Sequence, residues 1–162
     1  IIHSDIVDEK GKPVASTDYD AQCEKGFFSI NMKSMITAEQ LESWKDMTVT
    51  MEADNIDYPL EWTPGQALKD AHLKVNITMN SMNMPGTTID ITKRIIVGNE
   101  SIHTPIGTFD CIKITSNVKI KSIFGYEMQS VEWLSKGNGV IRTESYKGSK
   151  MKGYTLLTKL AK

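Results

Sequence analysis

Hydrophobic and polar residues alternate one by one along most of this chain. The clearest run extends from His72 to Asn80, where every second residue is apolar: Leu73, Val75, Ile77 and Met79. A period of two residues is typical of a β-strand with one face covered and the other in water. Short turn signals separate the runs, so the pattern predicts a mainly β protein with about ten antiparallel strands.

The closing stretch, Val131–Leu160, contains three extended segments joined by two turns that are rich in glycine. Lys136–Gly139 and Lys147–Lys150 are the turns, because glycine and asparagine adopt positive φ at little cost. The middle segment, Val140–Tyr146, alternates without a purely apolar face, so it should be only partly buried. The closing strand is expected from Tyr154 to Leu160. Three strands in this order form a β-meander, which needs another surface to cover its apolar face.

The rest of the chain carries weaker strand signals. Asp54–Asp70 contains two prolines and is predicted to be irregular, and turns are expected at Met84–Thr87 and at Gly98–Asn99. Further strands are expected at Ile1–Val7, Val14–Cys23, Phe27–Met32, Met47–Ala53, Thr88–Val97 and Phe109–Lys121.

One short helix is predicted, from about Ala38 to Asp46. Thr37 is placed to be the N-cap, and Gln40 follows three residues later as its capping-box partner. Ile36 and Leu41 occupy the two positions of a hydrophobic staple. We expect this helix to cover one end or one face of the sheet.

The whole chain, residues 1–162, is expected to form a single β-rich domain, because its length suits one domain. Helices and strands do not alternate along the chain, which argues against a parallel sheet. The first residue, Ile1, is not methionine, and Ile1–Val7 already has the pattern of a strand. We therefore expect that a further N-terminal segment precedes this chain.

Charge and composition narrow the classes of partner. The net charge is −1 and no basic face is visible, which argues against nucleic acid as a partner. No apolar run is long enough for a transmembrane helix. Cys23 and Cys111 could form a disulfide, but the sequence does not show that they meet, and two small buried side chains are the simpler interpretation.

Methionines form the most unusual local pattern, Met79-x-x-Met82-x-Met84. Thioethers are soft ligands that suit Cu(I). The simpler interpretation is that Met79 belongs to the apolar strand face and the other two fill gaps at its end. Copper binding is therefore kept only as a weaker alternative.

The sequence contains no recognisable catalytic motif and no cofactor-binding motif. His3, His72 and His103 lack metal-ligand spacing, and Cys111 lies in a strand with no oxyanion-hole motif nearby. The acidic residues between Asp54 and Glu61 do not have the spacing of a calcium loop. We expect no enzyme activity, no cofactor and no conventional metal site.

The segment Thr104–Ile114, TPIGTFDCIKI, resembles the P-A-G-T-F-x-C-Y-K-I segment of TapB-like exported bacterial proteins of unknown function. Ile106 replaces an alanine there, which is a packing change. The meander from Val131 to Leu157 is similar to that family's closing strands. The resemblance implies an exported, often lipid-anchored protein of the periplasm or outer membrane of a Gram-negative bacterium. It also implies a strongly curved antiparallel sheet, either a β-roll or a partly closed barrel, and no established activity.

This combination predicts a non-catalytic envelope protein that binds a ligand or has a structural or interaction role. Its partner would be an apolar ligand or another envelope protein, and a lipid anchor would lie upstream. A carrier of lipids or lipoproteins predicts a hollow concave face, whereas an interaction protein predicts a filled core with an exposed patch or edge. The candidate lining residues are Leu73, Val75, Ile77, Met79, Trp133 and Tyr154.

Overall fold

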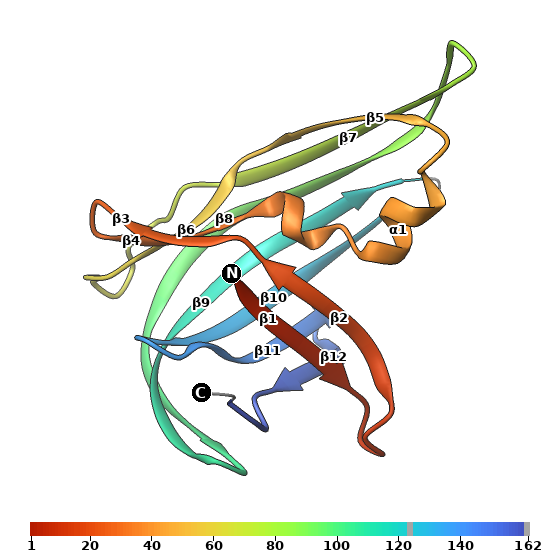
Figure 1. Ribbon diagram of the computed structural model, residues 1–162. Helices are drawn as coiled ribbons and strands as arrows, with labels where there is room; N and C mark the ends of the chain where they lie inside the picture. The colour runs from red at the N-terminus through yellow and green to blue at the C-terminus, as the bar shows by residue number, and fades with distance from the viewer. Residues whose placement is uncertain (123–124, 161–162) are drawn as a thin grey trace. The chain divides into compact units, whose positions relative to one another are not determined.

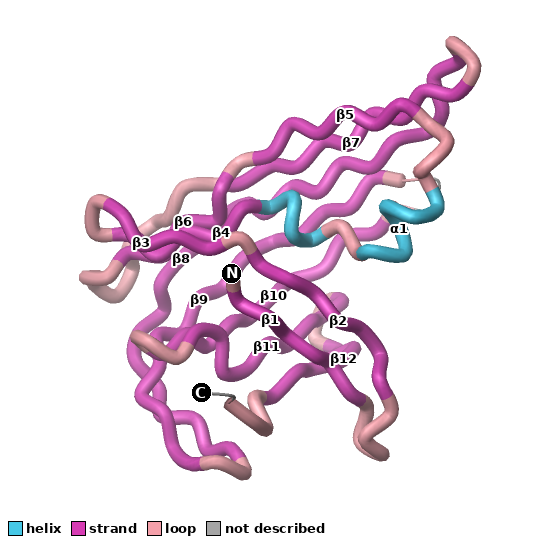
Figure 2. The backbone as a smooth tube through the Cα atoms, viewed as in Figure 1, coloured by secondary structure: helices cyan, strands magenta, loops and turns pink. Residues whose placement is uncertain are grey.

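The protein is mainly β, as the alternation predicts (Figures 1 and 2). The computed structural model describes residues 1–122 and 125–160. Within these residues it contains twelve strands, one short α-helix and one 3₁₀ helix. The strands are β1 (Ile2–Val7), β2 (Pro13–Tyr19), β3 (Ala21–Glu24), β4 (Phe27–Asn31), β5 (Thr48–Ala53), β6 (Asn55–Pro59), β7 (Ala71–Met79), β8 (Met82–Thr104), β9 (Gly107–Lys121), β10 (Tyr126–Ser135), β11 (Gly139–Lys147) and β12 (Lys150–Leu156).

The strands form three sheets. The large sheet has the order β12-β11-β10-β9-β8-β7-β5, while β3, β4 and β6 form a second sheet and β1 and β2 a third. The large sheet is open: β12 and β5 are its two edges, and no recorded pairing among the described residues joins them. The antiparallel β class is confirmed. The finer expectation, a strongly curved β-roll or partly closed barrel, is not confirmed, because the described strands of the large sheet form an open sheet.

The chain divides into two compact units. Unit 1 consists mainly of Ile1–Pro59 and Ala71–Asp90, and unit 2 mainly of Leu60–Asp70, Ile91–Lys119 and the chain from Tyr126 onward. The long strand β8 therefore contributes to both units. The division does not test the expectation of a single domain, which stays a prediction.

The core of unit 1 lies on the apolar face of β7. Leu73, Val75 and Ile77 are buried there, while the intervening side chains face away, so the predicted alternation is confirmed. The 3₁₀ helix η1 (Met32–Met35) packs against β5 and β7 and buries Met32 completely.

Helix α1 (Ala38–Ser43) begins with the predicted capping box. The Thr37 hydroxyl accepts a hydrogen bond from the Gln40 backbone at 3.2 Å, and the Gln40 side chain accepts one from the Thr37 backbone at 3.0 Å. The helix ends three residues earlier than predicted. Leu41 is 50% exposed, and α1 buries none of its residues, so packing does little to extend this helix.

The predicted turns at Met84–Thr87 and Gly98–Asn99 are wrong, because β8 runs continuously through both. The β7–β8 turn is instead at Asn80 and Ser81, whose φ angles of 49° and 65° match a tight hairpin turn. Glycine within a strand often marks an irregularity rather than a turn. β8 is also irregular at Lys93, whose φ angle is 53°. Before Lys93 the buried residues of β8 have odd numbers, and after it they have even numbers.

Three other boundaries differ from the prediction. The second predicted strand is split into β2 and β3 at Asp20, and the segment predicted to be irregular contains β6. Its remainder runs along β8, where Leu68 N donates to Arg94 O at 2.8 Å. The closing meander of β10, β11 and β12 is confirmed, but β12 begins at Lys150, several residues before the expected Tyr154.

The core of unit 2 lies beneath this meander. It consists of Ile102, Cys111, Trp133 and Ile141, with Phe109, Val131, Leu156 and Leu157 packed around them. Leu157 N donates to Ile141 O at 2.8 Å, which fastens the chain after β12 to the same core.

Candidate functional site

Four methionines lie on one face of β5, β7 and β8, and we call this surface the methionine face: Met51, Met79, Met82 and Met84. Met51 pairs with Val75, which places Met51 on the same side as the buried residues of β7. Met79 continues that side by alternation. Met82 and Met84 join it because the two-residue turn sets Met82 opposite Met79.

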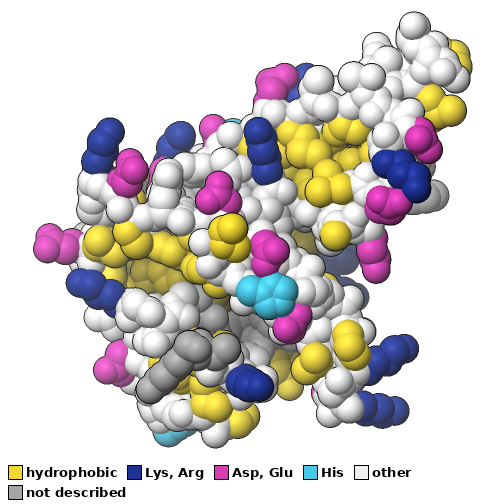
Figure 3. Space-filling view, in the orientation of Figure 1, with side chains coloured by type: hydrophobic (Ala, Val, Ile, Leu, Met, Phe, Trp, Pro, Cys, Tyr) yellow, Lys and Arg dark blue, Asp and Glu magenta, His cyan; other side chains and the backbone are white. Residues whose placement is uncertain are grey.

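The side of the sheet that carries the methionine face is buried in the middle of β7 and exposed towards the β7–β8 turn. Val75 is 1% exposed, whereas Met79, Met82 and Met84 are 41%, 64% and 42% exposed. Hydrophobic side chains gather over the β5 and β7 region in the space-filling view (Figure 3). An apolar stripe that leaves the core and reaches the surface is typical of a binding surface.

Strand β5 borders the methionine face and is an edge of the large sheet (Figure 1). Its outer backbone groups have no strand partner among residues 1–122 and 125–160. Within Thr48–Ala53, Glu52 is the one charged residue. The opposite edge, β12, instead carries Lys150 and Lys152, which are charges that discourage strand addition.

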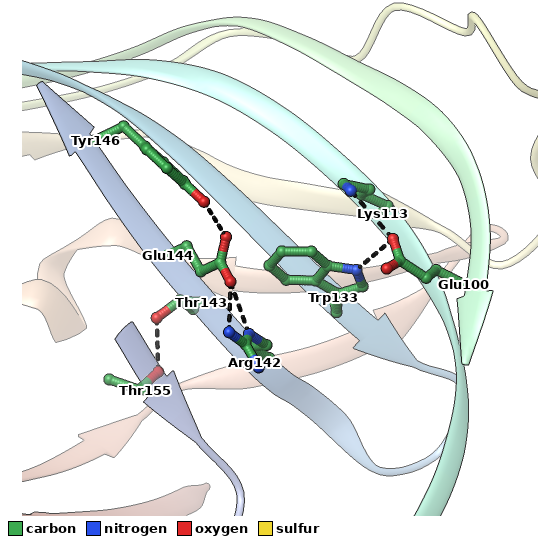
Figure 4. Close-up of polar contacts among 8 residues, drawn as sticks. All are labelled: Glu100, Lys113, Trp133, Arg142, Thr143, Glu144, Tyr146 and Thr155. Carbon is green, nitrogen blue, oxygen red and sulfur yellow. Dashed lines mark hydrogen bonds and ion pairs between the residues drawn. The ribbon is translucent and has the colours of Figure 1, made fainter. Parts of the chain in front are cut away.

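Unit 2 presents a second surface of different character, in which Arg142 is set between two aromatic rings. The Arg142 guanidinium carbon lies 5.7 Å from the ring centroid of Trp133 and 5.2 Å from that of Tyr154. Its Nε donates to Glu144 at 2.9 Å, and the same carboxylate accepts a hydrogen bond from the Tyr146 hydroxyl (Figure 4). That bond raises the pKa of Tyr146 and keeps its hydroxyl protonated. Arg142 on β11 thus contacts a ring on β10 and a ring on β12, and these contacts link the three strands.

Glu100 belongs to the same surface (Figure 4). It accepts hydrogen bonds from Trp133 Nε1 at 3.0 Å and from Lys113 Nζ at 3.1 Å. These two bonds, the Trp133 bond first, lower the pKa of Glu100 below its usual value. Lys113 Nζ also lies 4.9 Å from the centroid of the Trp133 ring, so the buried indole is held by a carboxylate and a cation together.

Both cysteines are free, and Cys111 is buried whereas Cys23 is exposed. The prediction that both side chains are buried is therefore wrong for Cys23. Burial raises the pKa of the Cys111 thiol to about 11, and the charges of Asp110 and Glu100 act in the same direction. The Cys111 sulfur is therefore a thiol near neutral pH, unlike the thiolate of a reactive cysteine.

Each histidine contacts a neighbour on a paired strand. His3 Nδ1 lies 2.6 Å from Asp18, His72 Nδ1 3.1 Å from Asp90, and His103 Nδ1 2.7 Å from the Thr108 hydroxyl. The Asp18 bond, followed by the charge of Asp5, raises the pKa of His3. Across the part of the chain that the structure describes, no three His, Cys, Asp or Glu residues gather as metal ligands.

Unit 2 also has two open hollows. One, of about 430 Å³, is lined by Trp62, Glu100, Asp110 and Lys136 among others, and the other, of about 270 Å³, by Glu127, Gln129 and Tyr146 among others. Charged and amide side chains contribute to both linings.

The predicted lining residues belong to two groups. Leu73, Val75 and Ile77 are packed in the core of unit 1, and Met79 is exposed on the same face. Trp133 is 4% exposed and Tyr154 is 52% exposed, and Arg142 brings these two together in unit 2.

Sequence reasoning missed Met51 and Arg142 as site residues. Both residues lie in runs of alternating apolar and polar residues, Met47–Ala53 and Val140–Tyr146. This alternation is the signal that could have placed them on strands. What the pattern could not reveal is which strand each residue pairs with, because β5 joins β7 across a long sequence separation.

Comparison with known proteins shows the family of this chain. The model of the DUF3108-like family matches residues 1–157, almost the entire chain. The chain belongs to the DUF3108-like family. None of the functionally curated proteins compared with it is significantly similar.

Two solved structures are similar to this DUF3108-like protein. One, from Bacteroides fragilis, is named as an inferred exported protein with a YmcC-like fold; it is 26% identical, with a TM-score of 0.69, over 95% of this chain and 76% of the relative. The other, from Parabacteroides distasonis, is named as an inferred lipoprotein; it is 25% identical, with a TM-score of 0.66, over 93% of this chain and 73% of the relative.

The names given to these relatives agree with the exported or lipid-anchored character that the sequence resemblance implied. The finer assignment to TapB-like proteins stays a prediction. Helices of the described residues offer no candidate for a membrane span, since none is long and apolar enough.

Proposed function

We propose that this DUF3108-like protein is a non-catalytic interaction module of the bacterial envelope. Its partner is an extended, apolar segment of another envelope protein, which adds as a strand to the free edge of β5. Alternate side chains of that segment lie on the methionine face. Two observations carry the proposal: the free edge of β5, and the exposed stripe of Met79, Met82 and Met84 on the adjoining strands β7 and β8 of the same sheet.

The physical argument joins two properties of the same region. A free strand edge supplies backbone hydrogen bonds, and neighbouring apolar positions supply specificity for every second residue of the added strand. Methionine suits such a surface because its flexible thioether adapts to different partners. β12 is the other edge of the large sheet, but Lys150 and Lys152 discourage strand addition there.

The lipid-carrier alternative has less support. The candidate lining residues Leu73 and Val75 are 0% and 1% exposed, so their side chains are already covered by protein. The two hollows in unit 2 have charged side chains in their linings. An acyl chain retained by the protein purified from its own host, detected by native mass spectrometry, would favour the carrier over the interaction module.

An envelope location agrees with the relatives, which are named as inferred exported protein and inferred lipoprotein. A periplasmic or outer-membrane position, with a lipid anchor upstream, fits this kinship. Nothing in the proposed mode of binding requires nucleic acid, a cofactor or a chemical step.

Site-specific photocrosslinking in the host tests the proposal. p-Benzoylphenylalanine in place of Thr50, on β5, should give one discrete adduct with an envelope protein. The same residue in place of Lys152, on β12, is the matched control and should give none. Met79→Ser with Met82→Ser should remove the Thr50 adduct, because the apolar surface is lost.

Two results would contradict the proposal. One is the absence of any discrete adduct from Thr50, and the other is an adduct of equal yield from Lys152. Amide hydrogen exchange in the isolated complex gives a second measurement, since strand addition should protect β5 amides and leave β12 amides unchanged.

A further inference from the structure

Three methionines frame the tip of the β7–β8 hairpin. Asn80 and Ser81 form its two-residue turn, and Thr78 Oγ1 donates to Asn83 Oδ1 at 3.4 Å across it. Thr78 and Asn83 are therefore opposite each other, which sets Met79 opposite Met82 on the other face. Met84 follows Met82 by two residues and shares that face.

This register brings three sulfur atoms within reach of one point. Side chains directly opposite in an antiparallel pair have Cβ atoms about 4.5–5.5 Å apart, and residues two apart along a strand are separated by about 7 Å. A methionine side chain has three rotatable bonds, which let its Sδ atom cover such distances. The sulfurs of Met79, Met82 and Met84 can therefore converge above the turn.

Exposure distinguishes these side chains from packing residues. Met32, on η1, is 0% exposed and fills the core of the same unit, whereas Met79, Met82 and Met84 are all more than two-fifths exposed. They remain open to a solute as well as to a protein partner.

We propose that the β7–β8 hairpin binds one Cu(I) ion through the Sδ atoms of Met79, Met82 and Met84. Neutral thioethers are soft ligands that select Cu(I), whereas Zn²⁺ prefers ligand sets with imidazole or thiolate and Cu²⁺ prefers nitrogen and oxygen. The side chains of Thr78 and Asn83 lie on the opposite face of the hairpin, so they do not enter this sulfur set. The site is separate in chemistry from strand addition at β5.

Competition for Cu(I) tests the site. The protein carries Cys23→Ser, because the exposed thiol of Cys23 would also bind copper. Cu(I) is titrated without oxygen against the chromogenic chelator bicinchoninate. One equivalent should bind, and Met82→Leu or Met84→Leu should each weaken binding by about tenfold or more, since a direct ligand is lost.

Matched controls make the result specific. Met151→Leu changes a methionine of β12 that is 45% exposed, and Cu(I) binding should be unaffected. Ag(I), which resembles Cu(I) but is not redox-active, should shift the methyl NMR signals of Met79, Met82 and Met84 alone. Zn²⁺ should not bind at this site.

The proposal is overturned if Cu(I) affinity is unchanged in Met82→Leu and Met84→Leu, or if Ag(I) shifts none of the three methyl signals. Leucine preserves apolar area, so the Thr50 crosslink should survive these substitutions even though copper binding is lost. Serine at the same positions should remove both. The failure of the copper site is thus distinguishable from the failure of the proposed docking function.

Discussion

Gly86 of β8 lies directly against the carbonyl of Val75 on β7. A Cβ atom added to Gly86 would be 2.1 Å from the Val75 oxygen, far inside van der Waals contact. The two strands are irregular here: Thr78 contacts Asn83, but His72 contacts Asp90, so β8 uses one residue more than β7 between these points. A β-bulge of this kind bends its strand, and glycine permits the close approach.

Gly86→Ala is therefore expected to destabilise the protein by more than about 2 kcal/mol, because backbone must move to admit the methyl group. Urea denaturation followed by circular dichroism measures the change. Gly153→Ala on β12 is the matched control, since nothing lies within 4 Å of its added Cβ, and its effect should be small. Equal destabilisation by both variants would contradict the close approach.

Removal of the Glu100 carboxylate should destabilise unit 2. In Glu100→Ala the indole N–H of Trp133 and the Lys113 ammonium both lose their acceptor, which we expect to cost about 1–2 kcal/mol. Glu100→Gln keeps an oxygen acceptor for the indole and should lose less. Thermal denaturation compares the two, and near-ultraviolet circular dichroism reports on the surroundings of Trp133. A larger loss in the glutamine variant would contradict this role.

The two cysteines should differ sharply in reactivity. Cys23 is exposed, whereas the Cys111 thiol is buried with a pKa of about 11. At neutral pH a thiol reagent should modify one cysteine quickly in the folded protein and both in denaturant. Mass spectrometry identifies the modified residue, and Cys23→Ser should abolish the fast reaction. Rapid modification of Cys111 in the folded protein would contradict its burial.

Acid should weaken unit 1 through Asp90. The hydrogen bond with His72, helped by the Lys121 ammonium 3.5 Å away, lowers the pKa of Asp90 below its ordinary value of 3.8. Because the folded-state pKa is the lower one, this stabilisation is fully present above about pH 5 and is lost as the pH falls through the folded-state pKa.

Urea midpoints measured between about pH 2 and pH 6 test this dependence. Asp90→Asn should be less stable than the parent at the upper end of that range, and the difference should shrink towards the lower end. A difference that is independent of pH would show that the Asp90 charge contributes nothing to stability.

The features that the sequence predicted correctly are local ones. The Thr37 capping box, the alternation in β7 and the glycine turns of the closing meander each depend on a few neighbouring residues. Such signals act within one turn or one strand, so they can be read without knowledge of the partner strand.

The errors occurred where a local signal had two physical meanings. Gly86 and Gly98 were interpreted as turn residues, but both lie inside β8. Glycine permits a tight turn and also a close approach or a bulge, and only the neighbouring strand decides between them. The closing strand also begins earlier than its pattern predicts, at Lys150 instead of Tyr154.

The sequence by itself determined the β class, the position of the helix and the unusual grouping of methionines at the end of a strand. The tertiary structure decided where those methionines lie: pairing of β5 with β7 adds Met51 to their face, and Met79, Met82 and Met84 remain exposed although Val75 on the same side of β7 is buried. Backbone pairing between distant segments depends on the register of two strands, and a period of two residues is the same for every register. The exposed methionine face is therefore a property of the fold, which no single strand of the sequence contains.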